Sequence, residues 1–402
     1  MLQLRPARET TALSETTVHR FSMSAAATIV AALTGFVACG DGDSLSDADS
    51  AVAGGVPRSM QIISETEGWV LTDERLLLST DAANEWMDVT PPDMAGRDIR
   101  GVTFLDFSNG WVVASGNSDS SGATQLVSAH TADSGAIWAM STVGTPDVAY
   151  SLSRAGAAYL SFVDSKHGWL LLQLATGIQF SGGELFRTRD GGGSWEKIEP
   201  PPIAGPIAFV DESTGIMTGG AAGDKAFVTH DGGDTWQAAL LPVSPELTSA
   251  YPRYEAPLFE SPQIASIPAS FASAGSSQSF VGLYSTRDGG QSWELASKVA
   301  WPDTIEIESL TPLDAVGSGG LIAVESDGGK VVTVTDDQQK PSVISPNGLP
   351  AGVIDVDFIS GQVGWALVQT NTCLSEKSNC VQSASVYSTS DSGQTWTQLN
   401  LP

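Results

Sequence analysis

The segment Thr188-Arg189-Asp190-Gly191-Gly192-Gly193-Ser194-Trp195 decides the fold, because the chain repeats it several times with small changes. We call each eight-residue copy a box. A box begins with Thr or Ser, carries Asp at its third position and ends with Trp. A unit repeated in this way can bury its apolar side chains only against neighbouring units, so it predicts a repeat architecture. The other boxes begin at Ser79, Thr131, Thr229, Thr286 and Thr389.

The Asp and the Trp of each box have the properties of structural residues. Asp at the start of a turn can accept hydrogen bonds from backbone N–H groups two residues on, and Gly supplies the positive φ that a tight turn needs. A Trp ring folded against a sheet removes roughly 150–250 Å² from water. We therefore expect a structural and not a catalytic role for Asp81, Trp86, Asp133, Trp138, Asp190, Trp195, Asp231, Trp236, Asp288, Trp293, Asp391 and Trp396.

A second motif, a Gly-Trp pair, precedes most boxes. It follows an apolar segment that ends in a polar turn, as in Val102-Thr103-Phe104-Leu105-Asp106 before Gly110-Trp111. Each unit then consists of four short strands, and four-stranded units that repeat about every 40–55 residues are typical of propeller blades. The other copies of the pair are Gly68-Trp69, Gly168-Trp169, Gly364-Trp365 and a weaker Gly215-Ile216.

The spacing of the boxes gives the number of blades. The gap between Trp293 and Trp396 is about twice the usual one, and it contains the strand-like segment Leu321-Ile322-Ala323-Val324. The segment Asp336–Pro341 stands where a degenerate box is expected. The sequence therefore predicts an all-β, seven-bladed β-propeller over residues 58–402, with four antiparallel strands per blade and box hairpins. Whole blades at both ends make strand exchange unnecessary for closing the ring.

Boxes that follow a Phe…Asp…Gly-Trp strand pair resemble the Asp-box (BNR repeat) propellers. The chain is similar to their seven-bladed photosystem II stability/assembly factor-like family over essentially everything after residue 58. This resemblance implies a non-catalytic assembly factor that binds a partner. The photosynthetic members are associated with a basic surface patch, whereas here Asp and Glu outnumber Lys and Arg by 46 to 19. This charge argues against a role in a photosystem.

Sialidases and some glucan-cleaving hydrolases also carry these boxes. A sialidase needs an arginine triad for the substrate carboxylate, a Tyr paired with a Glu, and an acid/base Asp. The Phe-Arg-Ile-Pro string that usually carries the first arginine is absent, and Phe186-Arg187-Thr188-Arg189 is the nearest string. The sequence does not show which two carboxylates stand ~5–10 Å apart, as a glycosidase requires. A sialidase-type or other exo-glycosidase is therefore the alternative function.

The N-terminal region predicts export. Residues 24–38 carry no charge and end at Cys39; such a segment is too short for a comfortable membrane span but suits the core of a signal peptide. The string Phe36-Val37-Ala38-Cys39 resembles a lipoprotein processing site, in which Cys39 is acylated. We predict a signal peptide over 1–39 and a flexible acidic tether rich in Gly and Ser over 40–57. The protein is then lipid-anchored in a bacterial cell envelope, in the periplasm or at the cell surface.

The remaining cysteines fit this compartment. Cys373 and Cys380 stand seven residues apart in one polar segment, and we predict that they form a local disulfide.

The four His residues are scattered, so no metal site is expected. No Walker loop, dinucleotide fingerprint or Gly-x-Ser-x-Gly elbow is present, and we expect no cofactor. A net charge of −27 excludes nucleic-acid binding as a main activity.

Long loops predict the binding surface. Extra residues gather between second and third strands and between blades, as at Pro242–Pro257. These loops emerge on the same face of a propeller, opposite the boxes. Functional residues concentrate in loops on a rigid scaffold, and Tyr, Trp and Arg dominate binding hot spots. The sequence thus predicts a monomeric, non-catalytic propeller that recognises a partner protein or a glycan on this face. Its candidate residues are Tyr150, Arg154, Tyr251, Arg253, Tyr254 and Trp301.

Substitution of Cys39 tests the anchor. Because Cys39 follows an apolar segment rich in small residues, we expect Cys39→Ser to turn a membrane-associated protein into a soluble or unprocessed one. Fractionation of cells that express either form measures this change. Recovery of both forms from the same fraction contradicts lipidation.

Overall fold

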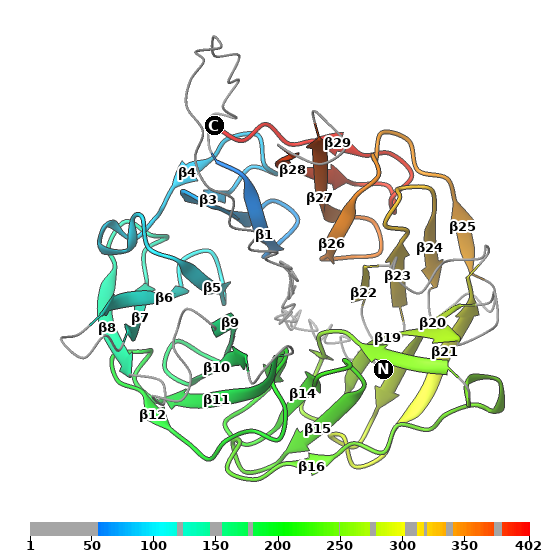
Figure 1. Cartoon of the computed structure of the whole chain (residues 1–402), viewed down its shortest axis with the longest axis horizontal. Coiled ribbons are helices and arrows are strands. Elements are labelled where there is room, and N and C mark those ends of the chain that lie inside the picture. The colour runs from blue at the N-terminus through cyan, green and yellow to red at the C-terminus, as the bar shows by residue number, and fades with distance from the viewer. Residues whose placement is uncertain are drawn as a thin grey trace, which may run out of the picture.

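The chain folds into a ring of seven β-sheets, as a computed structural model shows (Figure 1). We number these sheets as blades 1 to 7 in chain order. The structure describes residues 55–118, 124–144, 155–175, 180–248, 250–273, 279–301, 312–316, 320–334, 341–373 and 380–402. The predicted signal peptide with Cys39, and the tether up to residue 54, lie outside the described residues. Within the described residues, no helix has both the length and the apolar character needed to cross a membrane.

Each blade is built from consecutive strands. Blade 1 contains β1 (Pro57–Ile62), β2 (Gly68–Thr72), β3 (Leu76–Ser79) and β4 (Met87–Asp88). Blade 2 contains β5 (Ile99–Phe104), β6 (Gly110–Ser118), β7 (Thr124–Thr131) and β8 (Ala139–Gly144). Blade 3 contains β9 (Ala155–Phe162), β10 (Gly168–Ala175), β11 (Phe180–Thr188) and β12 (Glu196–Lys197). Blade 4 contains β13 (Ile207–Phe209), β14 (Gly215–Gly219), β15 (Lys225–Thr229) and β16 (Gln237–Ala238).

The remaining blades follow the same plan. Blade 5 contains β17 (Ala250–Tyr254), β18 (Leu258–Phe259), β19 (Ala265–Ser273), β20 (Phe280–Thr286) and β21 (Glu294–Ala300). Blade 6 contains β22 (Leu313–Val316), β23 (Gly320–Val324), β24 (Val331–Val334) and β25 (Ser342–Ile344). Blade 7 contains β26 (Val353–Phe358), β27 (Gly364–Cys373), β28 (Cys380–Thr389) and β29 (Thr397–Gln398).

The predicted seven-bladed propeller is confirmed. Neighbouring strands pair in antiparallel fashion in sequence order, and the first strands β1, β5, β9, β22 and β26 lie nearest the centre of the ring (Figure 1). Blades 1 and 7 each contain four strands that are consecutive in the chain. The ring therefore closes without strand exchange, as the sequence predicts.

The Gly-Trp pairs mark where second strands begin, and packing explains the glycine. In blade 3 the ring of Phe162, at the end of the first strand, lies across Gly168. A Cβ atom at Gly168 would stand 2.3 Å from that ring. Gly110 beside Phe104 and Gly364 beside Phe358 repeat this arrangement, with 2.4 Å and 2.3 Å. Any side chain at these positions would displace the aromatic ring, so only glycine fits.

The Trp of the pair joins one blade to the next. Trp169 of blade 3 stacks on Phe209 of blade 4, with ring centroids 3.8 Å apart, and its indole N–H donates to the Gly232 carbonyl at 2.8 Å. Gly232 belongs to the box of blade 4. The Trp236 of this box contacts the same Phe209 ring edge-on, with ring centroids 6.0 Å apart. Thus the box of blade 4 holds the tryptophan of the preceding blade. Trp111, Phe162, Gly191 and Trp195 repeat the arrangement between blades 2 and 3.

A second set of contacts joins the blades near the axis, where a side chain of one first strand accepts a backbone N–H of the next. The Ser161 hydroxyl accepts from Phe209 at 2.9 Å, and the Asp314 carboxylate accepts from Phe358 at 2.8 Å. At the closure of the ring, the fully buried Asp357 accepts from the Ile62 N–H at 2.7 Å. This last bond joins blade 7 to blade 1, between residues 295 positions apart in the chain.

Blade 5 departs from the predicted plan. The segment from Pro242 to Pro257, predicted to be a loop between blades, contains β17, and the first strand of the blade is split into β17 and β18. Both parts pair with β19, β17 through residues 269–273 and β18 through residues 265–266. The sequence predicts a loop here because apolar and polar residues do not alternate regularly along this segment, and because it contains Pro252 and Pro257.

Two other predictions fall partly outside the described residues. In blade 6, β24 pairs with β25, so a hairpin stands at the place of the degenerate box, but residues 335–340 are not described. In blade 7, Cys373 and Cys380 end β27 and begin β28, and their backbones are direct partners in the antiparallel register. The disulfide itself stays a prediction.

Truncation of Trp169 tests the contact between blades. We expect Trp169→Ala to lower the free energy of unfolding by about 3–5 kcal/mol, because a buried ring is lost. Trp169→Phe keeps an aromatic ring and loses the indole N–H, so it is expected to cost about 1–2 kcal/mol. Urea unfolding followed by circular dichroism measures both. Equal, near-zero effects of the two variants would contradict this account of the box.

Candidate functional site

The topology divides the propeller into two faces. In an antiparallel blade, the turn between strands one and two and the box between strands three and four emerge on one side. We call this side the box face. The hairpins between strands two and three, together with the connections between blades, emerge on the opposite side, which we call the long-loop face.

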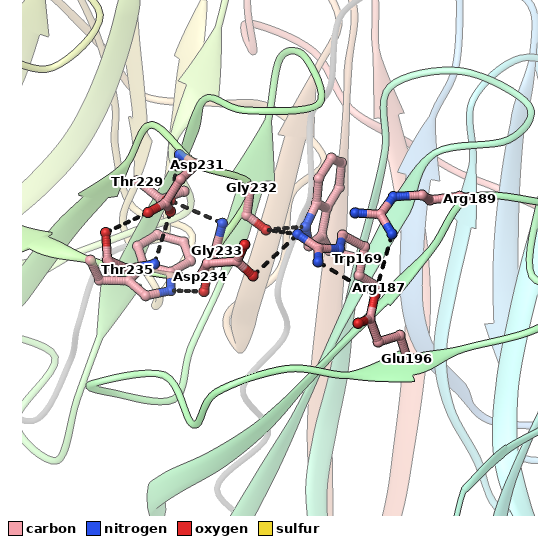
Figure 2. A network of polar contacts seen from close by, with 11 residues as sticks. Trp169, Arg187, Arg189, Glu196, Thr229, Asp231, Gly232, Gly233, Asp234 and Thr235 are labelled. Carbon is pink, nitrogen blue, oxygen red and sulfur yellow. Dashed lines mark hydrogen bonds and ion pairs between the residues drawn. The ribbon is translucent and has the colours of Figure 1, made fainter.

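The box of blade 4 shows how its Asp is used (Figure 2). The Thr229 hydroxyl donates to Asp231 Oδ1 at 2.8 Å and accepts from the Gly233 N–H at 2.9 Å. The carboxylate also accepts from the Thr235 N–H at 2.8 Å and from the Thr235 hydroxyl at 2.6 Å. The expectation of a bond to an N–H two residues on is wrong, because the turn extends further and brings the N–H four residues on to the carboxylate. Gly232 and Gly233 both adopt positive φ, 76° and 92°, which this longer turn requires.

These hydrogen bonds stabilise the charged form of the box carboxylates. The hydroxyl and the N–H of Ser292, together with the Thr286 hydroxyl, lower the pKa of Asp288 to about 2. The pKa is lowered from its ordinary value in the other five box residues as well: Asp81, Asp133, Asp190, Asp231 and Asp391. A carboxylate that stays ionised and accepts several hydrogen bonds serves structure better than general acid catalysis.

The arginines beside the boxes are also engaged in structure (Figure 2). Arg187 lies 3.4 Å from the Gly232 carbonyl, 3.3 Å from Asp234 of the same box and 3.4 Å from Glu196. Arg189 pairs with Glu196 at 3.4 Å. The string Phe186-Arg187-Thr188-Arg189, the nearest to the sialidase arginine signature, therefore bridges blades 3 and 4.

Two of the predicted binding residues lie in the core. Trp301 is 1% exposed, packs with Val281 and Leu321, and donates its indole N–H to Glu325 at 3.4 Å. Tyr254 is 8% exposed and meets Tyr284 edge-on at 5.9 Å. The prediction that they lie on an exposed binding surface is wrong, because apolar packing buries both rings. Tyr150 and Arg154 lie outside the described residues.

Tyr251 and Arg253 do reach the surface, and both lie on β17. Tyr251 is 67% exposed, and the partly exposed Arg253 places its Nε 3.5 Å from Glu255 Oε1. The β14–β15 hairpin supports the strand, since the Gly223 carbonyl accepts from the Tyr254 N–H at 2.8 Å. The Arg253 side chain crosses Gly223 so closely that a Cβ there would stand 3.1 Å from its Cγ. The strand therefore presents a Tyr and an Arg from a firm support.

Sequence reasoning missed two titratable residues beside Arg253. Burial raises the pKa of Glu255, which the charge of Arg253 partly opposes. Burial, with the charge of Glu255, raises the pKa of Tyr159 to about 12. Tyr159 comes from blade 3, Arg253 and Glu255 from blade 5, and the buried Thr218 of blade 4 donates to the Glu255 carbonyl at 2.8 Å. The ring thus gathers these groups from three blades, and no local motif in the sequence marks their meeting.

A second polar cluster on the long-loop face, centred on Arg100, joins the first strands of neighbouring blades. Arg100 donates to the Ser115 hydroxyl at 2.8 Å and to the Gly156 carbonyl of blade 3 at 3.2 Å. It also pairs with Asp98 at 2.8 Å, and Arg58 of blade 1 approaches the same carboxylate at 3.7 Å. Arg100 is largely buried among these partners, so its guanidinium joins blades and is not open to a ligand.

The box face carries a shallow cavity of about 400 Å³ between the first turns of blades 3 and 4. His167 stands near it, 2.9 Å from Asp164 and 3.7 Å from Glu212. Among the residues that the structure describes, no three His, Cys, Asp or Glu side chains are placed to hold a metal ion. The cavity is lined by Val163, Asp164, Val210, Asp211, Glu212 and Ser213.

Solved structures of similar fold cover most of the chain. YCF48 bound to D1 peptide is 19% identical, with a TM-score of 0.44 over 77% of this chain and 82% of that one. YCF48 from Cyanidioschyzon merolae is 15% identical, with a TM-score of 0.43 over 78% and 87%. The extracellular domain of a putative one-component system from B. thetaiotaomicron is 12% identical, with a TM-score of 0.47 over 80% and 39%. Neither a protein-family model nor a curated protein matches the sequence.

Acid should weaken the propeller through its boxes. A carboxyl whose pKa is lower in the folded chain stabilises the fold above its unfolded pKa, and this stability is lost as the pH falls through the folded pKa. With Asp288 at about 2, we expect the urea midpoint to fall steeply between about pH 4 and pH 2. Asp288→Asn should make this fall less steep. Ser292→Ala removes the largest stabilising bond of Asp288 and brings its folded pKa closer to the unfolded value, so it should also make the fall less steep. Identical pH profiles of all three proteins contradict the assignment.

Proposed function

We propose that this protein is an exported, lipid-anchored propeller that binds a partner protein or a glycan on its long-loop face, without catalysing a reaction. The exposed Tyr251 and the adjacent Arg253 on β17 carry this proposal. Tyr and Arg contribute most to binding hot spots, since each combines a large contact area with a polar group. The short strand holds them on a rigid support, which lowers the entropy lost on binding.

The two faces differ in how far their polar groups are already engaged in contacts, and this difference supports the same function. The box carboxylates and Arg187 are taken up by contacts within and between blades. Among the residues that the structure describes, Arg253 has one ion pair, at a long 3.5 Å, with a carboxyl whose pKa burial raises. A partner group that offers a better hydrogen bond can compete for this guanidinium. The surface around β17 is therefore better suited to recognition than the box face.

The glycosidase alternative has one observation in its favour, the proximity of Tyr159, Arg253 and Glu255. A Tyr and a Glu together with an Arg are parts of a sialidase site. Tyr159, however, is buried against Ile207 and Phe209, and its pKa is raised to about 12. A tyrosine nucleophile needs an accessible and more acidic hydroxyl. We therefore place the binding function first.

Paired variants on β17 test the proposed function. The partner is identified by a photo-crosslinking residue at position 251 in the native host, and its affinity for the full chain is then measured by calorimetry. Tyr251→Ala with Arg253→Ala should weaken binding by at least about 1 kcal/mol, roughly fivefold, at unchanged thermal stability. Tyr254→Ala should instead lower stability by about 3–5 kcal/mol, because this ring is buried.

An activity assay separates the two functions. We expect no release of sialic acid from standard sialosides by the purified protein. Efficient turnover that is lost in Tyr159→Phe or Glu255→Gln would install the glycosidase function and remove the binding one. Failure of the residue at position 251 to crosslink to any partner would also contradict a binding surface at β17.

A further inference from the structure

The fourth strands form the rim of the ring (Figure 1), and two of them are unusually long. Strands β4, β12, β16 and β29 have two residues each and β25 has three. Strand β8 of blade 2 has six residues and β21 of blade 5 has seven. A long outer strand presents unpaired backbone N–H and C=O groups, on which another chain can add a strand.

The two long strands differ in their protection. β21 carries Glu294 and Lys298, and Lys298 pairs with Glu246 of the preceding connection. Charged side chains, lysine above all, discourage strand addition. β8, Ala139–Gly144, contains no charged residue and no proline. Among the described residues it ends the order β5-β6-β7-β8, with no further strand on its outer side.

The residue before the box tryptophan of blade 2 is also unusual. In four other boxes this position carries a hydroxyl that donates to the box Asp at 2.5–2.6 Å; these residues are Ser194, Thr235, Ser292 and Thr395. In blade 2 it is Ile137, which is 72% exposed and keeps only the backbone N–H bond to Asp133, at 2.8 Å. A charge-assisted hydrogen bond is thus replaced by an apolar side chain in water, which costs stability. Met140, 37% exposed, lies three residues further on.

We propose that the outer edge of β8, with Ile137 and Met140, is a docking site where an extended segment of a partner protein adds a fifth strand to blade 2. Main-chain hydrogen bonds to β8 supply affinity, and apolar side chains at alternate positions of the segment cover the two exposed side chains. On this proposal, Ile137 serves binding, while the box of blade 2 lacks the hydroxyl hydrogen bond that would stabilise it.

Charge selects the kind of segment. Asp133 lies exposed at the start of the box, and the whole chain has a net charge of −27. A segment with basic residues at its ends is attracted to this surface. A second copy of the chain brings the same negative charge and is repelled. This rim site is separate from β17 on the long-loop face and does not depend on the proposed function.

A designed peptide tests the docking site on the full chain. The probe is fluorescent Lys-Thr-Val-Thr-Val-Thr-Val-Lys, and its control has the central Val replaced by Pro, which keeps the charge and prevents strand pairing. Anisotropy measures affinity, and hydrogen exchange with mass spectrometry measures protection of the β8 amides. We expect the probe to bind and to protect Ala139–Gly144 but not Glu294–Ala300.

Three variants separate docking from a structural role. Ile137→Ser and Met140→Lys should each weaken probe binding at least about fivefold. Ile137→Ser should at the same time raise the thermal midpoint by about 1–2 °C, because it restores the box hydroxyl. Ser194→Ile places an isoleucine beside the short β12 and should leave the affinity for the probe unchanged. Equal binding of the Pro-containing control, affinity unchanged in Ile137→Ser and Met140→Lys, protection elsewhere, or no binding each overturns the proposal.

Discussion

The hydrogen bond from a buried indole to the box of the next blade is the contact on which this propeller depends. Trp111 donates to Gly191 and Trp169 to Gly232, both at 2.8 Å, while each indole stacks on a phenylalanine of the next blade. A fully buried N–H needs a partner, so the indole specifies where the following box must lie. The same contact requires glycine before the Trp and a turn with two positive φ angles in the box. The two sequence motifs are thus the two halves of one joint.

The joint is not repeated around the whole ring. Ile216 and Ser266 stand in the place of the Trp in blades 4 and 5, and neither can donate an indole hydrogen bond. Between blades 7 and 1, Trp365 packs against Trp86 at 5.9 Å, and the buried Asp357 adds its bond to the Ile62 N–H. The split first strand of blade 5 lies in the region without the indole joint. Tyr251 and Arg253 therefore lie on a part of the ring where the repeated contact is absent.

Structure and recognition use different polar groups for a physical reason. The box carboxylates accept several hydrogen bonds each, which lowers their pKa and leaves few lone pairs for a ligand. The groups proposed for binding are less well satisfied. Arg253 pairs with Glu255 at a long 3.5 Å, and Ile137 exposes an apolar side chain where a hydroxyl would strengthen the box. Local departures from the repeat that lower stability therefore point to the two surfaces proposed for partners.

The sequence by itself determined the class of fold, the seven blades and the role of the boxes, because each of these follows from residues close together in the chain. The strand starts at Gly68, Gly110, Gly168, Gly215 and Gly364 are visible in the same way. Only the tertiary structure decided that Tyr254 is buried while Tyr251 is exposed, since alternation along the split strand β17 depends on its pairing with β19. It also buried Trp301 by packing this ring with Val281 and Leu321. It alone brought Tyr159, Thr218 and Glu255 together from three blades, because closure of a ring joins residues whose distance along the chain carries no signal.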